Sequence, residues 1–165
     1  MAIVIREANE TDFDAIWDIF HPIVKAGTTY AFNPHITKED AFDLWMNKPR
    51  QTFVAEEEGH ILGTYYINAN YAGPGGHVAN CGYMVGKKAQ GKGIATKMCE
   101  HSQEVALLLG FKAMQFNCVV STNVRAVKLW QSLGFNIIGT LPKAFEHAQD
   151  GYVDAHVMYK WLEAA

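Results

Sequence analysis

Apolar and polar residues follow a strand-like or a helix-like spacing along most of the chain. Alternation at residues 3–7 predicts a first strand. Apolar residues then recur on one helical face, which predicts a helix with Thr11 as its N-cap that runs to about Lys25 and ends at Gly27. The same helical spacing predicts a second helix at residues 38–47.

The rest of the chain alternates strands with two further helices. Residues 51–56 and 60–69 are expected to form an antiparallel hairpin, because a Glu/Gly turn separates two β-patterned runs. The remaining expected elements are a strand at 77–85, a helix at 92–109, a strand at 112–120, a short helix at 123–133, and two last strands at 135–140 and 152–161 with a polar loop at 142–151 between them.

The apolar spacing also predicts which faces of the last two helices are buried. For the helix at 92–109 we expect an inward stripe of Ile94, Met98, Val105 and Leu108 or Leu109. For the helix at 123–133 we expect one apolar face made of Val124, Val127, Trp130 and Leu133.

This order of elements mixes antiparallel hairpins with a β-α-β crossover. It predicts a mixed α/β fold, with one twisted sheet of about seven strands and helices on both faces. Because the chain has 165 residues and no repeat, linker or low-complexity segment, we expect a single domain over residues 1–165.

Composition narrows the function classes. A net charge of −3 argues against nucleic acid as a partner, and no apolar run reaches the roughly 20 residues that span a bilayer. Arg6 interrupts the start of the chain, where a signal peptide would be apolar, so a cytoplasmic protein is expected. The three cysteines form no C-x-x-C pair, which suits a reducing compartment. The histidines show no metal-binding spacing, so no metal is predicted.

Residues 85–96 join an apolar strand to a helix through a basic turn punctuated by glycines. In such a turn the backbone N–H groups and the helix dipole can hold a phosphate. Gly86-x-x-x-x-Gly91-Lys92 matches the start of an NTPase P-loop, but Gly93 stands where Ser or Thr must bind magnesium. Only Gly91-x-Gly93 of a dinucleotide fingerprint is present, and its β-α unit comes in the middle of the chain. The turn therefore indicates a phosphate site of another kind.

A resemblance to a known family indicates which phosphate compound this turn binds. Gln90-x-x-Gly93-x-Ala95 resembles the Q/R-x-x-G-x-G/A motif of the GNAT superfamily of N-acetyltransferases, in which this helix N-terminus binds the pyrophosphate of acetyl-CoA. The family's second cofactor segment, N-x-x-A-x-x-x-Y-x-x-x-G-F, is resembled by Asn123-x-x-Ala126-x-x-x-Trp130-x-x-x-Gly134-Phe135. With the order of elements, the resemblance covers nearly the whole chain.

Within this superfamily the chain is most similar to the L-azetidine-2-carboxylate (proline-analogue) N-acetyltransferases, and less similar to the phosphinothricin N-acetyltransferases. Both groups acylate the amine of a small amino acid. The segments that carry this similarity include Gly110-Phe111-Lys112-Ala113, Phe116-Asn117, Pro142-Lys143-Ala144 and Tyr152-Val153-Asp154-Ala155.

The resemblance implies a set of residues that bind acetyl-CoA. The pantetheine arm is expected along the strand at Tyr83–Val85, with Met84 and Val85 as cofactor-binding residues, and one backbone N–H of this strand is expected to polarise the thioester oxygen. The pyrophosphate is expected at Gln90, Gly91, Lys92, Gly93, Ile94, Ala95 and Thr96.

Asn123 is expected to cap a helix, to contact a pantetheine amide, or to do both. Trp130 stands where the family commonly has a Tyr that protonates the leaving thiolate. Because an indole is no useful acid near neutral pH, Trp130 is expected to be an apolar wall.

Asn80 and Asn117 are the candidate catalytic residues. Asn is uncommon inside strands, and both positions match Asn positions of the proline-analogue enzymes, where they are implied to hold the substrate's amine or carboxylate. The alternative is that both amides only satisfy backbone groups. Gly82 is expected either to mark a bulge that opens a cleft or to admit a bulky neighbour.

No side chain is identified as the general base. Asp154 and His156 could reach the cleft from the last strand, and a water chain to solvent could serve instead. A nucleophilic Cys81 or Cys118 that forms an acyl-enzyme is a further alternative to direct transfer.

The expected function is acetyl transfer from acetyl-CoA to the amine of a small amino or imino acid. The alternatives are an enzyme that acts on phosphinothricin or methionine sulfoximine, and a non-catalytic acyl-CoA-binding domain, which the Trp at position 130 keeps open. The resemblance also implies detoxification of amino-acid analogues and a homodimer formed through a sheet edge or an N-terminal helix.

Overall fold

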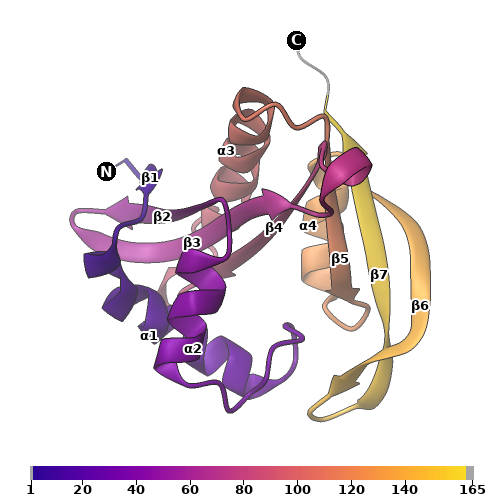
Figure 1. Ribbon diagram of the computed structural model, residues 1–165. Coiled ribbons are helices and arrows are strands. Elements are labelled where there is room, and N and C mark those ends of the chain that lie inside the picture. The colour runs from indigo at the N-terminus through magenta and orange to yellow at the C-terminus, as the bar shows by residue number, and fades with distance from the viewer. Residues whose placement is uncertain (1, 163–165) are drawn as a thin grey trace.

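The computed structural model describes residues 2–162, which form one seven-stranded sheet flanked by helices (Figure 1). The strand order is β1-β2-β3-β4-β5-β7-β6, and β4 and β5 are parallel whereas all other neighbours are antiparallel. The strands are β1 Val4–Glu7, β2 Gln51–Glu57, β3 His60–Ala69, β4 Val78–Val85, β5 Ala113–Val120, β6 Asn136–His147 and β7 Gly151–Trp161. The helices are α1 Phe13–Ala26, α2 Lys38–Phe42, α3 Ile94–Leu108 and α4 Val124–Ser132.

Helices cover both faces of this sheet, as predicted. In Figure 1, α1 and α2 lie in front of the strands and α3 lies behind them. Two buried clusters correspond to these faces, because successive side chains of a strand point to opposite sides. Met84 of β4 packs with Phe20 and Trp45 under α1 and α2, whereas Tyr83 packs with Met98 on the α3 side.

The start of the first helix differs by a few residues from the expectation. Asn9, rather than Thr11, is the N-cap, and it forms a capping box with Asp12 around a short 3-10 turn. Arg6 donates to both Asp12 and Glu56, so this ion-pair cluster joins β1, β2 and the helix start. The arginine holds the pKa of Asp12 below its usual range.

The second helix ends in a π-helical turn, Asp43–Asn47, which the sequence pattern did not predict. This turn buries Trp45 completely, and the Trp45 indole donates to the Thr64 hydroxyl on β3. The backbone N–H of Lys48 closes the turn by donating to the Asp43 carbonyl over 3.0 Å.

Of the two alternatives at the end of the predicted α3 stripe, the structure supports Leu109, which packs against the core, whereas Leu108 is 86% exposed. The buried residues of this helix are Ile94, Met98, Cys99, Ser102 and Ala106. Successive residues four apart rotate by about 40° around a helix, so this stripe turns away from Leu108 and is centred on the small residue Ser102. On α4, Val124 is 53% exposed, whereas Val127, Trp130 and Leu133 pack against the core as expected.

The polar loop predicted at 142–151 is also wrong. Strand β6 continues to His147 opposite β7, and only residues 148–150 form the turn. A register shift between Leu141 and Phe145 accommodates Pro142 and Lys143, and the φ of Lys143 is 53°. A second shift lies between Ile137 and Gly139. Because β6 is an edge strand, the missing N–H of the proline breaks no ladder on its outer side.

Within residues 2–162 the structure contains no helix that is both long enough and apolar enough to cross a membrane.

The strongest irregularity of the sheet lies between its two central strands. β4 and β5 pair only at Val78–Ala113 and Ala79–Met114 and then separate. This split, which the diverging ribbons in Figure 1 show, positions the candidate site.

Candidate active site

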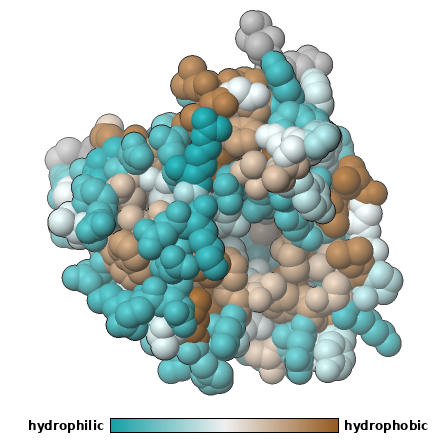
Figure 2. All heavy atoms as spheres, in the orientation of Figure 1, coloured by the Kyte–Doolittle hydropathy of each residue, from teal (hydrophilic) through white to brown (hydrophobic). Residues whose placement is uncertain are grey.

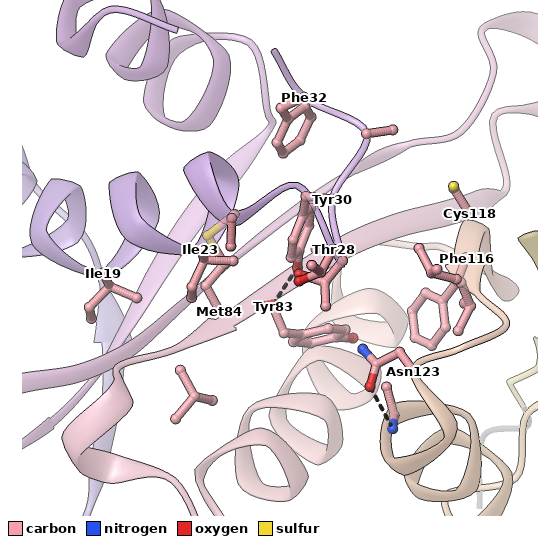
Figure 3. A pocket seen from close by; sticks show the side chains of 18 of the residues that line it. Ile19, Ile23, Thr28, Tyr30, Phe32, Tyr83, Met84, Phe116, Cys118 and Asn123 are labelled. Carbon is pink, nitrogen blue, oxygen red and sulfur yellow. Dashed lines mark hydrogen bonds between the residues drawn. The ribbon is translucent and has the colours of Figure 1, made fainter. Parts of the chain in front are cut away.

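A cavity of about 810 Å³ follows the split between β4 and β5. Its walls come from the end of α1, the α1–α2 connection (residues 27–37), β4, β5 and α4. Figure 3 shows these elements around it, and Figure 2 shows a hollow near the middle of the same face of the molecule. The volume falls within the range of about 300–1,000 Å³ that is usual for small-molecule sites.

Strand geometry determines which backbone groups of β4 face the split. The N–H of Gly86 donates to Leu62, and the carbonyl of Val78 accepts from Asn70, so the even-numbered residues of β4 pair with β3. The N–H and C=O groups of Tyr83 and Val85 therefore point toward β5, where the ladder has already ended.

Met84, a predicted cofactor residue, lines the cavity, but its backbone N–H faces β3. Val85, the other residue predicted on this strand, lines the cavity with its backbone turned into the split. The backbone groups of β4 that face the split next to this turn are thus those of Tyr83 and Val85.

Gly82 does not mark a bulge. The register between β3 and β4 is continuous from Gly63–Val85 to Ala69–Ala79. A Cβ at Gly82 would lie 2.6 Å from Cε2 of Tyr66, so this glycine admits a bulky neighbour. Of the two roles considered for Gly82, the structure supports the second.

Asn80 lies where the two central strands separate. Its Nδ2 donates to the backbone carbonyl of Gln115 over 3.0 Å, one position beyond the last ladder pair of β4 and β5. Its Oδ1 accepts from the Tyr66 hydroxyl over 2.9 Å. Asn80 therefore bridges the split where it begins, and its amide group is held at the cavity wall.

Asn117 lies across the split on β5, and it is exposed to the cavity. It donates to Asn70 over 2.7 Å and accepts from the side chain of Gln115 over 2.9 Å. The structure thus brings Asn80 and Asn117, which are far apart in sequence, to opposite walls of one cavity.

The α1–α2 connection contributes residues that sequence reasoning missed. Tyr30 points from this connection toward β4, and its hydroxyl donates to the backbone carbonyl of Tyr83 (Figure 3). Thr28 and Phe32 lie beside it, and Phe32 stacks on Tyr30 with 5.4 Å between the ring centroids. The only signal for these residues was an aromatic pair in a segment without periodicity.

Two tyrosine hydroxyls therefore reach this cavity, one from Tyr30 and one from Tyr66. Burial raises the pKa of Tyr66 to about 12 and raises the pKa of Tyr30 well above its ordinary value. Both phenols stay protonated near neutral pH, so they can donate hydrogen bonds but cannot serve as bases.

The predicted phosphate turn opens α3 at one end of the split. Gly91 and Gly93 have φ values of 83° and 75°, and a Cβ at either position would meet no atom within 4 Å. No side chain caps the helix, so the N–H groups of Ile94, Ala95 and Thr96 have no partner within it. This open, glycine-lined turn fits a diphosphate.

The side chains around this turn lie in three different places: in the core, at the cavity wall and outside the cavity. That of Ile94 is buried in the core, so this residue offers only its backbone. Gln90 and Lys87 line the cavity. Lys92 lies outside it, with its ammonium 3.7 Å from a carboxylate oxygen of Glu57.

Asn123 and Trp130 border the cavity from α4. Asn123 caps this helix by accepting from the N–H of Ala126 over 3.4 Å, so the capping role is confirmed. The Trp130 ring lies 5.1 Å from the rings of both Tyr83 and Phe116. Trp130 is thus part of an apolar aromatic wall, as predicted.

Position argues against Asp154 and His156 as bases, and burial argues against Cys81 and Cys118 as nucleophiles, although both cysteines line the cavity. Asp154 accepts from the backbone N–H of Lys143, and neither Asp154 nor His156 lines the cavity. Burial raises the pKa of both Cys81 and Cys118, which keeps them as thiols and weakens the acyl-enzyme alternative. Among residues 2–162, no three His, Cys, Asp or Glu side chains are grouped to hold a metal.

Comparison with known proteins agrees with this geometry. The model of the acetyltransferase (GNAT) family matches residues 13–135, which include β4, the phosphate turn and the segment from Asn123 to Phe135. The chain belongs to the GNAT acetyltransferase family. A solved GNAT structure from Kribbella flavida is 46% identical over 98% of both chains, with a TM-score of 0.93.

Two further matches of this GNAT protein are less similar in sequence. N-acetyltransferase aca1 from Schizosaccharomyces pombe is 35% identical over 98 residues, which are 59% of this chain and 47% of aca1. The chain thus spans less than half the length of that curated relative. A phosphinothricin acetyltransferase from Sinorhizobium meliloti, solved in complex with acetyl-CoA, is 20% identical over 98% of this chain and 89% of its own, with a TM-score of 0.86. This last likeness shows the fold.

Proposed function

We propose that this GNAT protein transfers the acetyl group of acetyl-CoA directly to the amine of a small amino or imino acid. One observation carries the proposal: backbone groups of β4 without a partner on β5 lie next to the open glycine turn of α3 at one end of the split. At the other end they lie next to the polar side chains of Asn80 and Asn117. Together they can hold a long thioester and a small acceptor.

On the cofactor side, the backbone does most of the binding. The N–H groups of residues 91–96, with Lys87 and Gln90 nearby, would hold the pyrophosphate. The N–H groups of Tyr83 and Val85 and the C=O of Val85 would pair with the amides of the pantetheine arm, as an added strand does, whereas the C=O of Tyr83 accepts from the Tyr30 hydroxyl. When bound, acetyl-CoA supplies an activated acetyl thioester, and one of these two N–H groups would polarise its carbonyl oxygen.

On the acceptor side, side chains select the substrate. The amides of Asn80 and Asn117 would hold the amine or the carboxylate of the acceptor, since carboxamides both donate and accept. A substrate that forms no hydrogen bond with them loses the net contribution of about 0.5–1.5 kcal/mol that each such bond makes. An acceptor of the phosphinothricin type is the alternative, which the name of the Sinorhizobium meliloti neighbour favours.

Proton transfer in this site relies on solvent rather than on a dedicated base. The charged residues that line the main cavity are Asp18, at its α1 rim, and Lys87. The cavity is open, so water can take the proton of the acceptor nitrogen. Acetylation removes the basicity of a toxic amino-acid analogue, and a role in cytoplasmic detoxification stays a prediction.

The test is a thiol-release assay with acetyl-CoA and a panel of amines. We expect release with azetidine-2-carboxylate and proline, and little with peptides or basic protein tails. Faster release with phosphinothricin or methionine sulfoximine would shift the substrate class to that alternative. Tight binding of coenzyme A without release from any amine would contradict the proposal and indicate a non-catalytic binding domain.

A further inference from the structure

A second, smaller cavity of about 260 Å³ adjoins the main one. The two cavities share Phe32, Tyr66, Asn80 and Asn117, so an acceptor at the two Asn residues lies between them. The smaller cavity is below the usual size of a whole ligand site, and it suits one functional group of a substrate. Its other walls are Leu44, Lys48, Pro49, Asn68, Ala69 and Asn70.

The lining of this smaller cavity has a distinct chemistry. It contains four carboxamides and one lysine, and none of its described lining residues is acidic. Asn70 accepts from Asn117 with its Oδ1, which leaves the hydrogens of its Nδ2 for another acceptor. A group with several lone pairs and a negative charge matches these donors better than an ammonium does.

The fold holds Lys48 at this place from both sides. Its own N–H closes the π-helical turn, and Pro49 after it is buried. The N–H of Arg50 then donates to the Ile67 carbonyl of β3 over 3.1 Å. The backbone at Lys48 is therefore anchored to a helix and to the sheet, although its side chain is 66% exposed.

The ammonium of Lys48 is only loosely engaged within the protein. Its nearest described carboxylate is that of Asp43, at 3.7 Å, and both side chains are exposed. An exposed ion pair of this kind contributes little to stability, so replacing Asp43 with a substrate anion as the partner of Lys48 costs little free energy. The π-helical turn is thus followed by a lysine that lines the smaller cavity and whose charge is only loosely paired.

We propose that the smaller cavity binds the carboxylate of the acceptor, with Lys48 and the Nδ2 group of Asn70 as its donors. The acceptor's amine then points past Asn80 and Asn117 into the main cavity. This inference rests on the proposed acetyl transfer and restricts its acceptors to amines that carry a nearby carboxylate. Lys48 is thereby a specificity-determining residue.

The experiment compares K48M with the matched control K97M, because Lys97 is an exposed lysine on α3, behind the sheet. Each variant is assayed with azetidine-2-carboxylate and with azetidine, which lacks the carboxylate. We expect K48M to raise KM for the acid about tenfold and to leave KM for azetidine and for acetyl-CoA unchanged. K48R should restore most of the affinity for the acid, and K97M should match the wild type.

A binding measurement separates this inference from the proposed function. Azetidine-2-carboxylate is titrated by calorimetry into the wild type and K48M, each saturated with coenzyme A. A tenfold weaker affinity in K48M supports the carboxylate site even if no amine is acetylated, an outcome that would contradict only the proposed function. Equal affinities of the two proteins for the acid, or equal losses for acid and azetidine, would overturn the carboxylate site.

Discussion

The two ends of the split between β4 and β5 differ in the groups that they offer to a ligand. The proposed cofactor side consists mainly of backbone, namely the N–H groups that open α3 and the groups of Tyr83 and Val85 that have no partner on β5. The proposed acceptor side consists of side chains from separate strands, namely Tyr66, Asn80 and Asn117. A backbone site tolerates many side chains, whereas a side-chain site changes with each substitution.

This difference explains how one fold can keep a cofactor and change its acceptor. The backbone groups of the split follow from the ladder, which ends after Ala79 and Met114. The acceptor wall depends on the residues that the α1–α2 connection and the π-helical turn bring to β4. Variants on the cofactor side should therefore alter the affinity for coenzyme A, whereas variants on the acceptor side should alter KM for the acceptor.

The largest effect is expected for G93D on the cofactor side. The new carboxylate would stand among the N–H groups that open α3 and would repel a diphosphate, so the affinity for coenzyme A should fall more than 100-fold, or about 3 kcal/mol. Calorimetric titration with coenzyme A measures it. The control is G59D, because Gly59 also has a positive φ, 81°, and open space, but lies in the β2–β3 turn. Equal losses in the two variants would attribute the effect to backbone strain.

A smaller effect is expected for G82A on the acceptor side. The added methyl would lie 2.6 Å from the Tyr66 ring, which also packs edge-on against Trp45, so the ring cannot move freely. We expect a loss of about 1–3 kcal/mol in the free energy of unfolding. Because the Tyr66 hydroxyl holds Asn80, KM for the acceptor should rise as well. Denaturant unfolding and steady-state kinetics measure the two effects.

The matched control for this variant is G139A. Gly139 lies in β6, has no positive φ, and would place a Cβ with no atom within 4 Å. If G82A were as stable as the wild type, the Tyr66 ring could move to make room for the methyl group. Gly82 would then not be needed to admit this ring.

The proposed cofactor side depends mostly on local sequence and the proposed acceptor side on tertiary packing, so more of the cofactor side could be predicted from sequence. The phosphate turn is local: Gly91 and Gly93 are near neighbours, and their spacing with Gln90 carries the family motif. The mixed sheet and the helices on both faces followed from periodicity, and the structure confirms them. These features depend on short stretches of chain, which a single sequence displays directly.

What sequence missed depends on tertiary packing. Tyr30 sits in a connection without periodicity, and only the fold brings its hydroxyl to the carbonyl of Tyr83. Strand parity, which turns the N–H of Met84 away from the split, requires the register with β3. The spacing left Leu108 and Leu109 as alternatives on α3, and only the packing around the buried small residues Ser102 and Ala106 selects Leu109. Packing overrides residue type in such cases.

The next effect tests the acceptor side at Asn117. N117A removes one amide from the cavity wall, and we expect KM for the amino acid to rise about tenfold while the affinity for acetyl-CoA stays within twofold. Asn117 is exposed, so its loss should hardly change the melting temperature. N136A, at an exposed position on β6, is the control. A lower melting temperature with unchanged KM would mean that Asn117 only supports Asn70 and Gln115.

The smallest effect is expected for W130F, which distinguishes a wall from an acid. Trp130 contributes ring area against Tyr83 and Phe116, and phenylalanine keeps most of that area while it removes the indole N–H. We therefore expect kcat within about threefold of the wild type, because an essential acid would contribute about 10²–10⁴. W130A, which removes the wall, should weaken coenzyme A binding more than W130F does. A hundredfold loss of kcat in W130F, with coenzyme A binding intact, would instead show that the indole N–H takes part in the transfer step.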